Sequence, residues 1–158
     1  MIDDETTAMT IVDINDASGS VIEPDWLAKA EPIHRQLRPQ LPPDYAKKMR
    51  RVFAGGGRLC VAARGGAVVG VAVYRIHENT FDGVQMYVDD LVTDEACRSE
   101  GVGEALLGHL ARLARAAGGQ TLTLDSGTQR QRAHRFYFRQ GMTITSFHFS
   151  KPLRRDPA

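Results

Sequence analysis

The sequence predicts one α/β domain, built on a mixed, mostly antiparallel sheet with helices on both faces. Three observations support this. The 158 residues fit a single domain, and β-rich runs alternate with segments of helical spacing. Gly65-Gly66 joins two neighbouring β-rich runs, as a tight hairpin turn requires. The expected order is strand, helix, helix, three strands, helix, strand, helix, strand.

The first elements follow from local patterns. Residues 9–14 are rich in Ile and Val and predict a strand. Pro24 suits the first position of a helix, and apolar residues recur after it at helical spacing. Pro32 interrupts that pattern, so we expect a kink or two short helices. Asp44 can cap a second helix that ends at the Gly55 turn.

The middle of the chain predicts three antiparallel strands in succession, at residues 58–64, 67–77 and 84–93. Residues 101–117 form a strongly periodic helix, and 121–125 a buried strand. A crossover through that helix makes the two flanking strands parallel.

The last part of the domain predicts a helix and a strand. Thr128 and Gln131 have the spacing of a capping box for the helix, which Gly141 ends. Residues 143–149 alternate in polarity and predict a final strand. We expect the folded domain to span residues 8–150, between a disordered tail at 1–7 and a C-terminal tail at 151–158.

Composition gives little reason to expect a nucleic-acid or membrane partner. The formal net charge is +1, too small to attract polyanions in bulk, and no apolar run approaches the ~18 residues that span a bilayer. Cys60 and Cys97 make neither a disulfide framework nor a metal set. His134 and His148 lack a ligand set, and His109 fits a packed or surface position, so we assign no metal. We expect a cytoplasmic protein.

The segment that carries chemistry runs from Asp89 to Gly103, where a strand passes through a short loop into a helix. Helix-start N–H groups lack intrahelical partners and carry the positive end of the macrodipole. Glycines at Gly101 and Gly103 remove Cβ atoms that would keep an anion away, so the pattern favours a pyrophosphate cradle. It lacks the Gly-Lys-Ser/Thr ending of a nucleotide-binding P-loop.

Arg98-x-x-Gly101-x-Gly103 resembles the acetyl-CoA loop of the GNAT superfamily of N-acetyltransferases. Ala133-x-x-x-Tyr137, with Gly141-Met142 four residues on, is similar to the family's second signature, in which Phe usually follows that Gly. The resemblance covers residues 84–149 well, and the first half in element order only.

The resemblance implies a set of acetyl-CoA contacts. Leu91, Val92 and Thr93 would pair their backbone with the pantetheine arm like an added strand. Tyr137 would protonate the departing CoA sulfur. The backbone N–H groups that would hold the pyrophosphate belong to Arg98, Ser99, Glu100, Gly101, Val102, Gly103 and Glu104.

Two positions stay open. Asp89 and Asp90 occupy the strand end where relatives often place an acid, and either, or an ordered water, could deprotonate the amine. Strand alternation puts them on opposite faces unless a bulge intervenes. Arg130 stands where the family often has Asn, and it could reach a CoA phosphate instead.

The sequence therefore predicts an acetyl-CoA-dependent N-acetyltransferase that acts by direct transfer in a ternary complex. A non-catalytic CoA-binding or regulatory module on the same fold is the alternative, and a nucleic-acid-binding domain is a third. The expected acceptor is an amine-bearing small molecule or peptide. Family members often dimerise, and residues 143–149 could form such an edge.

Overall fold

The computed structural model describes residues 8–154 and divides the chain into two compact units, Met1–Leu124 and Asp125–Ala158. The first unit holds the sheet and three α-helices, and the second holds one further helix. The expected tail at residues 1–7 and the last four residues of the expected C-terminal tail lie outside the described residues.

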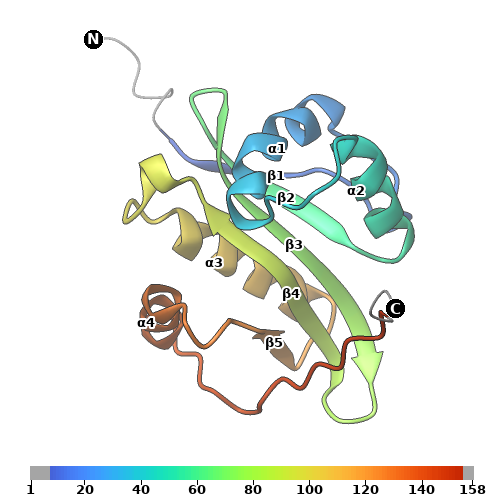
Figure 1. Ribbon diagram of the computed structural model, residues 1–158, viewed down its shortest axis with the longest axis vertical. Coiled ribbons are helices and arrows are strands. Elements are labelled where there is room, and N and C mark those ends of the chain that lie inside the picture. The colour runs from blue at the N-terminus through green and yellow to red at the C-terminus, as the bar shows by residue number, and fades with distance from the viewer. Residues whose placement is uncertain (1–7, 155–158) are drawn as a thin grey trace. The chain divides into compact units, whose positions relative to one another are not determined.

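The sheet has five strands in the order β1-β2-β3-β4-β5 (Figure 1). The first four pair antiparallel, and β4 and β5 pair parallel, which confirms the mixed, mostly antiparallel sheet. Gly65 and Gly66 form the β2–β3 turn with φ values of 55° and 77°. The strands are β1 (Thr10–Asp13), β2 (Arg58–Arg64), β3 (Ala67–Asn79), β4 (Gly83–Thr93) and β5 (Thr121–Leu124).

Helices cover both faces of this sheet, as expected. Helices α1 (Pro24–Leu37) and α2 (Tyr45–Ala54) lie on one face, and α3 (Val102–Ala116) lies on the other (Figure 1). Each face has its own apolar core. The α1–α2 core includes Leu27, Ile33, Met49, Phe53, Leu59, Val61, Val71 and Val73, and the α3 core includes Ala72, Tyr74, Met86, Val88, Val102, Leu106 and Leu110.

Local signals place the first two helices. Pro24 starts α1, and the Asp44 side chain caps α2 by accepting a 3.0 Å hydrogen bond from the Lys47 backbone N–H. The expectation of two short helices around Pro32 is wrong, since α1 runs unbroken from 24 to 37. Pro32 is exposed while Ile33 is buried. Packing of the opposite face against the sheet therefore maintains the helix across the lost N–H bond.

The second unit contains α4 (Gln131–Arg139), where a helix was expected. The expected capping box is wrong, because Arg130 occupies the N-cap and no side chain caps the helix. Thr128 lies two residues before that cap, out of register for the box.

The expected final strand is also wrong, because residues 143–149 have no regular secondary structure. Ile144, Phe147 and Phe149 are 72%, 84% and 91% exposed. Alternating polarity describes a two-faced segment, but a strand also needs a paired neighbour. Among residues 8–154, none of the α-helices is long and apolar enough to cross a membrane.

Candidate active site

A β-bulge shapes the centre of β4. The pairing of β3 with β4 places Tyr74 opposite Val88 and Val73 opposite Asp90, so Asp89 is an extra residue without a cross-strand partner. An extra residue interrupts the alternation of the strand and redirects the side chains around it. This is the condition under which both carboxylates can serve one side of the sheet.

Asp90 is held by side chains from α1. Its carboxylate accepts a 2.7 Å hydrogen bond from the Nε of Arg38 and lies 2.8 Å from the Nε2 of His34. The other ring nitrogen of His34 lies 2.9 Å from the Tyr45 hydroxyl. The chain Tyr45–His34–Asp90–Arg38 thus ties α1 and α2 to β4, with Tyr45 and His34 buried and Arg38 at the solvent-exposed end.

Burial and neighbouring groups shift the pKa values of two members of this chain, Asp90 and Tyr45. Burial acts to raise the pKa of Asp90, but the hydrogen bonds from His34 and Arg38 outweigh it, and the pKa lies below its ordinary value. Burial raises the pKa of Tyr45, and the nearby charges of Glu31 and Asp90 raise it further. Tyr45 therefore stays protonated and can donate to Nδ1 of His34, while Nε2 of His34 can donate to Asp90. Asp90 is a weak proton acceptor in this setting.

Asp89 lies in a more open environment. Its side chain is 29% exposed, against 13% for Asp90. Its carboxylate accepts a 3.0 Å hydrogen bond from the Nε of Arg75, which also donates to the carbonyl of Gly55 at the end of α2. Of the two acids, Asp89 is therefore the more accessible to solvent.

The far edge of β4 is free where the pantetheine arm was expected. On one side, Leu91, Val92 and Thr93 pair with β3. On the other side, β5 pairs with β4 only from Gln85 to Val88 among the described residues. Beyond Val88, the backbone of β4 therefore offers donors and acceptors to an added extended chain.

The loop after β4 is anchored to α1. The Asp94 carboxylate accepts hydrogen bonds from the backbone N–H of Ala96, at 3.2 Å, and from the Gln36 amide, at 3.0 Å. Gln36 in turn accepts a 3.0 Å hydrogen bond from the N–H of Glu95. These contacts close the short 3-10 turn η2 (Glu95–Cys97) and set where the chain turns toward α3.

The start of α3 has the backbone of an anion site. Gly101 is its N-cap with a left-handed φ of 81°, and a Cβ there would meet nothing within 4 Å. No side chain caps the helix, so its first N–H groups are available to an anion. Ser99 also has a positive φ, of 66°. Arg98 is exposed beside this turn, and Glu100 pairs with Arg64 of β2.

Gly70 on β3 lets this helix start lie close to the sheet. A Cβ at Gly70 would stand 2.6 Å from Val102 Cγ1 and 2.9 Å from Leu106 Cδ1. Both distances are shorter than any normal carbon contact. The absence of a side chain at Gly70 thus positions the first turn of α3.

Tyr137 and Arg130 belong to the second unit. Tyr137 lies on α4 beside Phe136, with ring centroids 5.5 Å apart. Burial raises the pKa of the Tyr137 phenol, partly offset by the charge of Arg130. Asp89, Asp90, the β4 edge and the start of α3 all belong to the first unit, whereas Tyr137 on α4 and Arg130 at its N-cap belong to the second.

Sequence reasoning missed His34, Arg38 and Tyr45. One signal was present. His34 follows Leu27 by seven residues and Ala30 by four, and so falls on the buried stripe of α1. A polar residue in that stripe needs a buried partner, but the pattern does not say that the partner is Asp90.

Comparison with known proteins identifies the class. The acetyltransferase (GNAT) family matches residues 24–142. The chain therefore belongs to the GNAT family and is an acyltransferase. It is 34% identical over 139 residues to the uncharacterized N-acetyltransferase YhdJ of Bacillus subtilis strain 168, covering 82% of this chain and 92% of that one.

Two further proteins share parts of this likeness. The chain is 32% identical over 97 residues to the aminoalkylphosphonate N-acetyltransferase of Salmonella typhimurium strain LT2, covering 59% of this chain and 61% of the relative. The aminoglycoside N-acetyltransferase AAC(6')-Iy in complex with CoA matches in fold with a TM-score of 0.79 at 17% identity, over 94% of this chain and 97% of that one. The same enzyme with a bisubstrate analogue matches with a TM-score of 0.77 at 17% identity, over 94% and 100%.

Proposed function

We propose that this protein is an acetyl-CoA-dependent N-acetyltransferase that moves the acetyl group directly to an amine acceptor in a ternary complex. One observation carries the proposal. The unpaired edge of β4 leads through an anchored turn into the uncapped start of α3. The strand edge suits an extended pantetheine arm, and the helix start that follows it suits a pyrophosphate.

Each part of the cofactor has residues that fit it. The backbone of Leu91, Val92 and Thr93 would pair with the pantetheine arm along the β4 edge. Arg130 would meet a CoA phosphate from the second unit. The pyrophosphate would lie on the backbone N–H groups of Arg98, Ser99, Glu100, Gly101, Val102, Gly103 and Glu104.

Acetyl-CoA supplies an acetyl thioester, whose carbonyl carbon accepts the amine nitrogen as the C–S bond breaks. Tyr137 would give its phenolic proton to the departing sulfur and regain one from solvent, while the proton of the amine passes to Asp89 or a water. Burial raises the pKa of Tyr137, which keeps the phenol protonated before the thiolate forms. A backbone N–H near Val92 would stabilise the charge that develops on the carbonyl oxygen.

Asp89 is the better candidate for accepting the proton of the amine, directly or through a water. It is more exposed than Asp90, and among the described residues its carboxylate pairs with one cation, Arg75. Asp90 instead acts as a positioning residue that secures α1 beside the bulge.

The acceptor is an amine on a small molecule or peptide. The relative from Salmonella is named for an aminoalkylphosphonate, and AAC(6')-Iy for aminoglycosides. Both names describe small molecules that carry amines. The carboxylate of Asp89 would attract an ammonium group before it loses its proton.

Calorimetric titration with acetyl-CoA tests the cofactor site. The informative variant is Gly101→Glu, and the matched control is Gly118→Glu, since both glycines have a positive φ and open space around the missing Cβ. The two variants therefore carry the same backbone strain at opposite ends of α3. We expect the first to weaken binding at least tenfold and the second to leave it unchanged. Equal affinity in both would contradict the proposed cradle.

Turnover separates the enzyme from a CoA-binding module on the same fold. A panel of amines with wild-type protein should yield acetylated product, and Tyr137→Phe should slow its formation. Binding of acetyl-CoA with no product from any amine would favour the module.

A further inference from the structure

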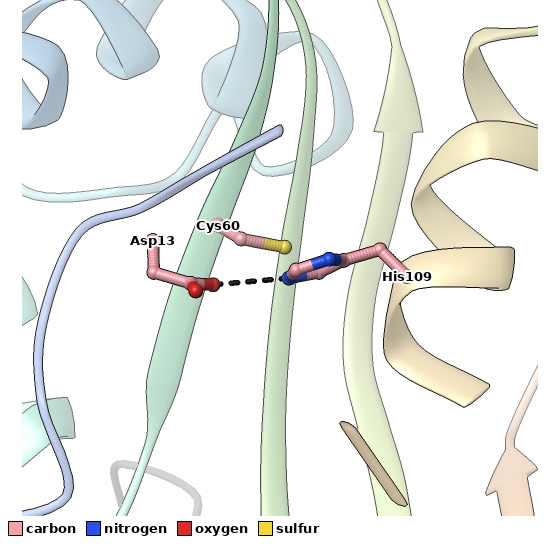
Figure 2. Close-up of side chains that lie close together, drawn as sticks. All are labelled: Asp13, Cys60 and His109. Atoms are coloured by element: carbon pink, nitrogen blue, oxygen red, sulfur yellow. Dashed lines mark hydrogen bonds and ion pairs between the residues drawn. The ribbon is translucent and has the colours of Figure 1, made fainter. Parts of the chain in front are cut away.

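Three side chains with metal-binding atoms converge away from the proposed acetyl-CoA site. The ligand atoms of Asp13, Cys60 and His109 all lie within 4.8 Å of one another (Figure 2). They come from β1, β2 and α3, and Figure 2 shows them turned toward one point. The Nε2 of His109 lies 3.1 Å from the Asp13 carboxylate.

Sheet register explains why they meet. Asp13 and Cys60 are direct cross-strand partners in the β1–β2 pairing, so their side chains leave the same face of the sheet. Cys60 belongs to the apolar core between the sheet and α3, and His109 is a residue of α3. The cluster is thus on the α3 face, whereas the partners of Asp90 come from α1 on the other face.

We propose that Asp13, Cys60 and His109 bind a divalent transition-metal ion, zinc by preference. Thiolate, imidazole and carboxylate are the ligands that zinc takes in proteins, and tetrahedral bonds of about 2.0–2.3 Å place ligand atoms roughly 3.3–3.5 Å apart. The 3.1 Å pair is about 0.2 Å short of that spacing, and within the 4.8 Å limit the sulfur would have to approach by at most about 1.3 Å.

The site has room for a fourth ligand from solvent. The side chain of Asp13 is 37% exposed and that of His109 is 17% exposed, while Cys60 is fully buried beneath them. Water can therefore complete the coordination from the open side. With three strand and helix ligands, the ion would clamp β1, β2 and α3 together and act as a structural metal.

Binding must displace the proton of the Cys60 thiol. The ion bonds to the sulfur, the S–H proton leaves to solvent, and the Nε2–H proton of His109 moves to Nδ1 so that Nε2 can ligate. Burial raises the pKa of Cys60, as does the charge of Asp13, and Arg58 opposes them. The ion must therefore bind the sulfur strongly enough to release that proton.

Cobalt titration is the direct test. Protein dialysed free of metal is titrated with Co²⁺, and absorbance is followed in the thiolate-to-cobalt charge-transfer region and in the visible bands of tetrahedral Co²⁺. We expect both bands at one ion per chain, their loss in Cys60→Ser, and their retention in Cys97→Ser, which removes the other thiol. Absence of the bands in wild type, or their dependence on Cys97, would overturn the site.

Thermal melting with zinc is a second test. It uses two variants, so its outcome does not depend on whether any single variant folds. Zinc at a hundredfold excess over Kd should raise Tm by about 5–10 °C. Asp13→Asn and His109→Gln keep the thiol and should each lose most of that rise. An equal rise in these variants would overturn the proposal.

The metal proposal and the acetyl-CoA proposal can be tested independently of each other. Acetyl-CoA affinity, measured by calorimetry, should be the same with and without the metal. If the metal does not bind, the transferase proposal still stands. If acetyl-CoA does not bind, the metal proposal still stands.

Discussion

Asp90 carries its charge inside the fold because His34 and Arg38 meet it there. Its carboxylate is 13% exposed, and both of its oxygens have partners. A buried charge without such partners would be strongly destabilising. At the scale of the residue, Asp90 is therefore held for stability, and its less buried neighbour, Asp89, is the proposed proton acceptor.

Replacing Asp90 by Asn should lower the free energy of unfolding by about 2 kcal/mol near neutral pH, because two charge-assisted hydrogen bonds weaken. The pKa of Asp90 is lowered in the folded state. Its contribution is thus present above the unfolded pKa, about 3.9, and is lost as pH falls through the folded pKa. The difference in unfolding free energy between wild type and Asp90→Asn should therefore narrow below about pH 4. Urea unfolding at several pH values measures it. In the exposed control Asp25→Asn, a comparable pH-dependent gap would argue against this account.

Tyr137→Phe should lower kcat by about 100-fold, the scale of a general acid, and leave the KM for acetyl-CoA nearly unchanged. Steady-state kinetics measure both. The control is Phe138→Leu, because Phe138 lies next on α4 and is 53% exposed. A similar loss in the control would point to α4 structure instead of acid catalysis.

At the scale of the element, the contact between β3 and α3 sets the position of the proposed anion site at the start of α3. Gly70→Ala would place a Cβ against Val102 and Leu106 and 3.2 Å from the Val92 carbonyl oxygen. We expect a loss of about 1–3 kcal/mol in unfolding free energy, measured by denaturant. Gly108→Ala, inside α3 with only Arg112 nearby, should be neutral or stabilising by up to about 1 kcal/mol. Equal effects would show that the close approach is not the cause.

Elements defined by contiguous residues were predictable. Asp44 with its cap, the Gly65-Gly66 hairpin and the loop before Gly101 each depend on neighbours in sequence. The exposed segment at 143–149 was not, because alternating polarity does not supply a pairing partner.

Contacts between distant residues lay beyond sequence reasoning. The bulge at Asp89 depends on the register of β3 against β4. His109 and Asp13 are 96 positions apart in the sequence. The register of β1 and the packing of α3 against the sheet bring them together. His34 could be flagged as a buried polar residue, but its partner could not.

At the scale of the whole molecule, the two faces of the sheet in the first unit carry different groups. The α1–α2 face holds the Asp90 network, and the α3 face holds the Asp13–Cys60–His109 cluster. The proposed acetyl-CoA contacts lie along the β4 edge and at the start of α3.

Binding of acetyl-CoA should stabilise the folded chain as a whole. At a hundredfold excess over Kd the gain is about 2.7 kcal/mol, or a rise of about 5–10 °C in Tm for a chain of this size. Thermal scans of wild type and Gly118→Glu should show this rise, and Gly101→Glu should show about half of it or less, because its affinity is at least tenfold weaker. A rise of the same size in Gly101→Glu would place the cofactor elsewhere.

The most direct measurement of the central claim is acetyl transfer itself. Wild-type protein with acetyl-CoA is offered aminoalkylphosphonates, aminoglycosides, polyamines and peptides, while CoA thiol release and acetylated product are followed by a thiol reagent and mass spectrometry. The account predicts equal amounts of free CoA and acetylated amine for at least one acceptor, and little of either with Gly101→Glu. No acetylated amine from any acceptor despite acetyl-CoA binding, or undiminished transfer by Gly101→Glu, would contradict it.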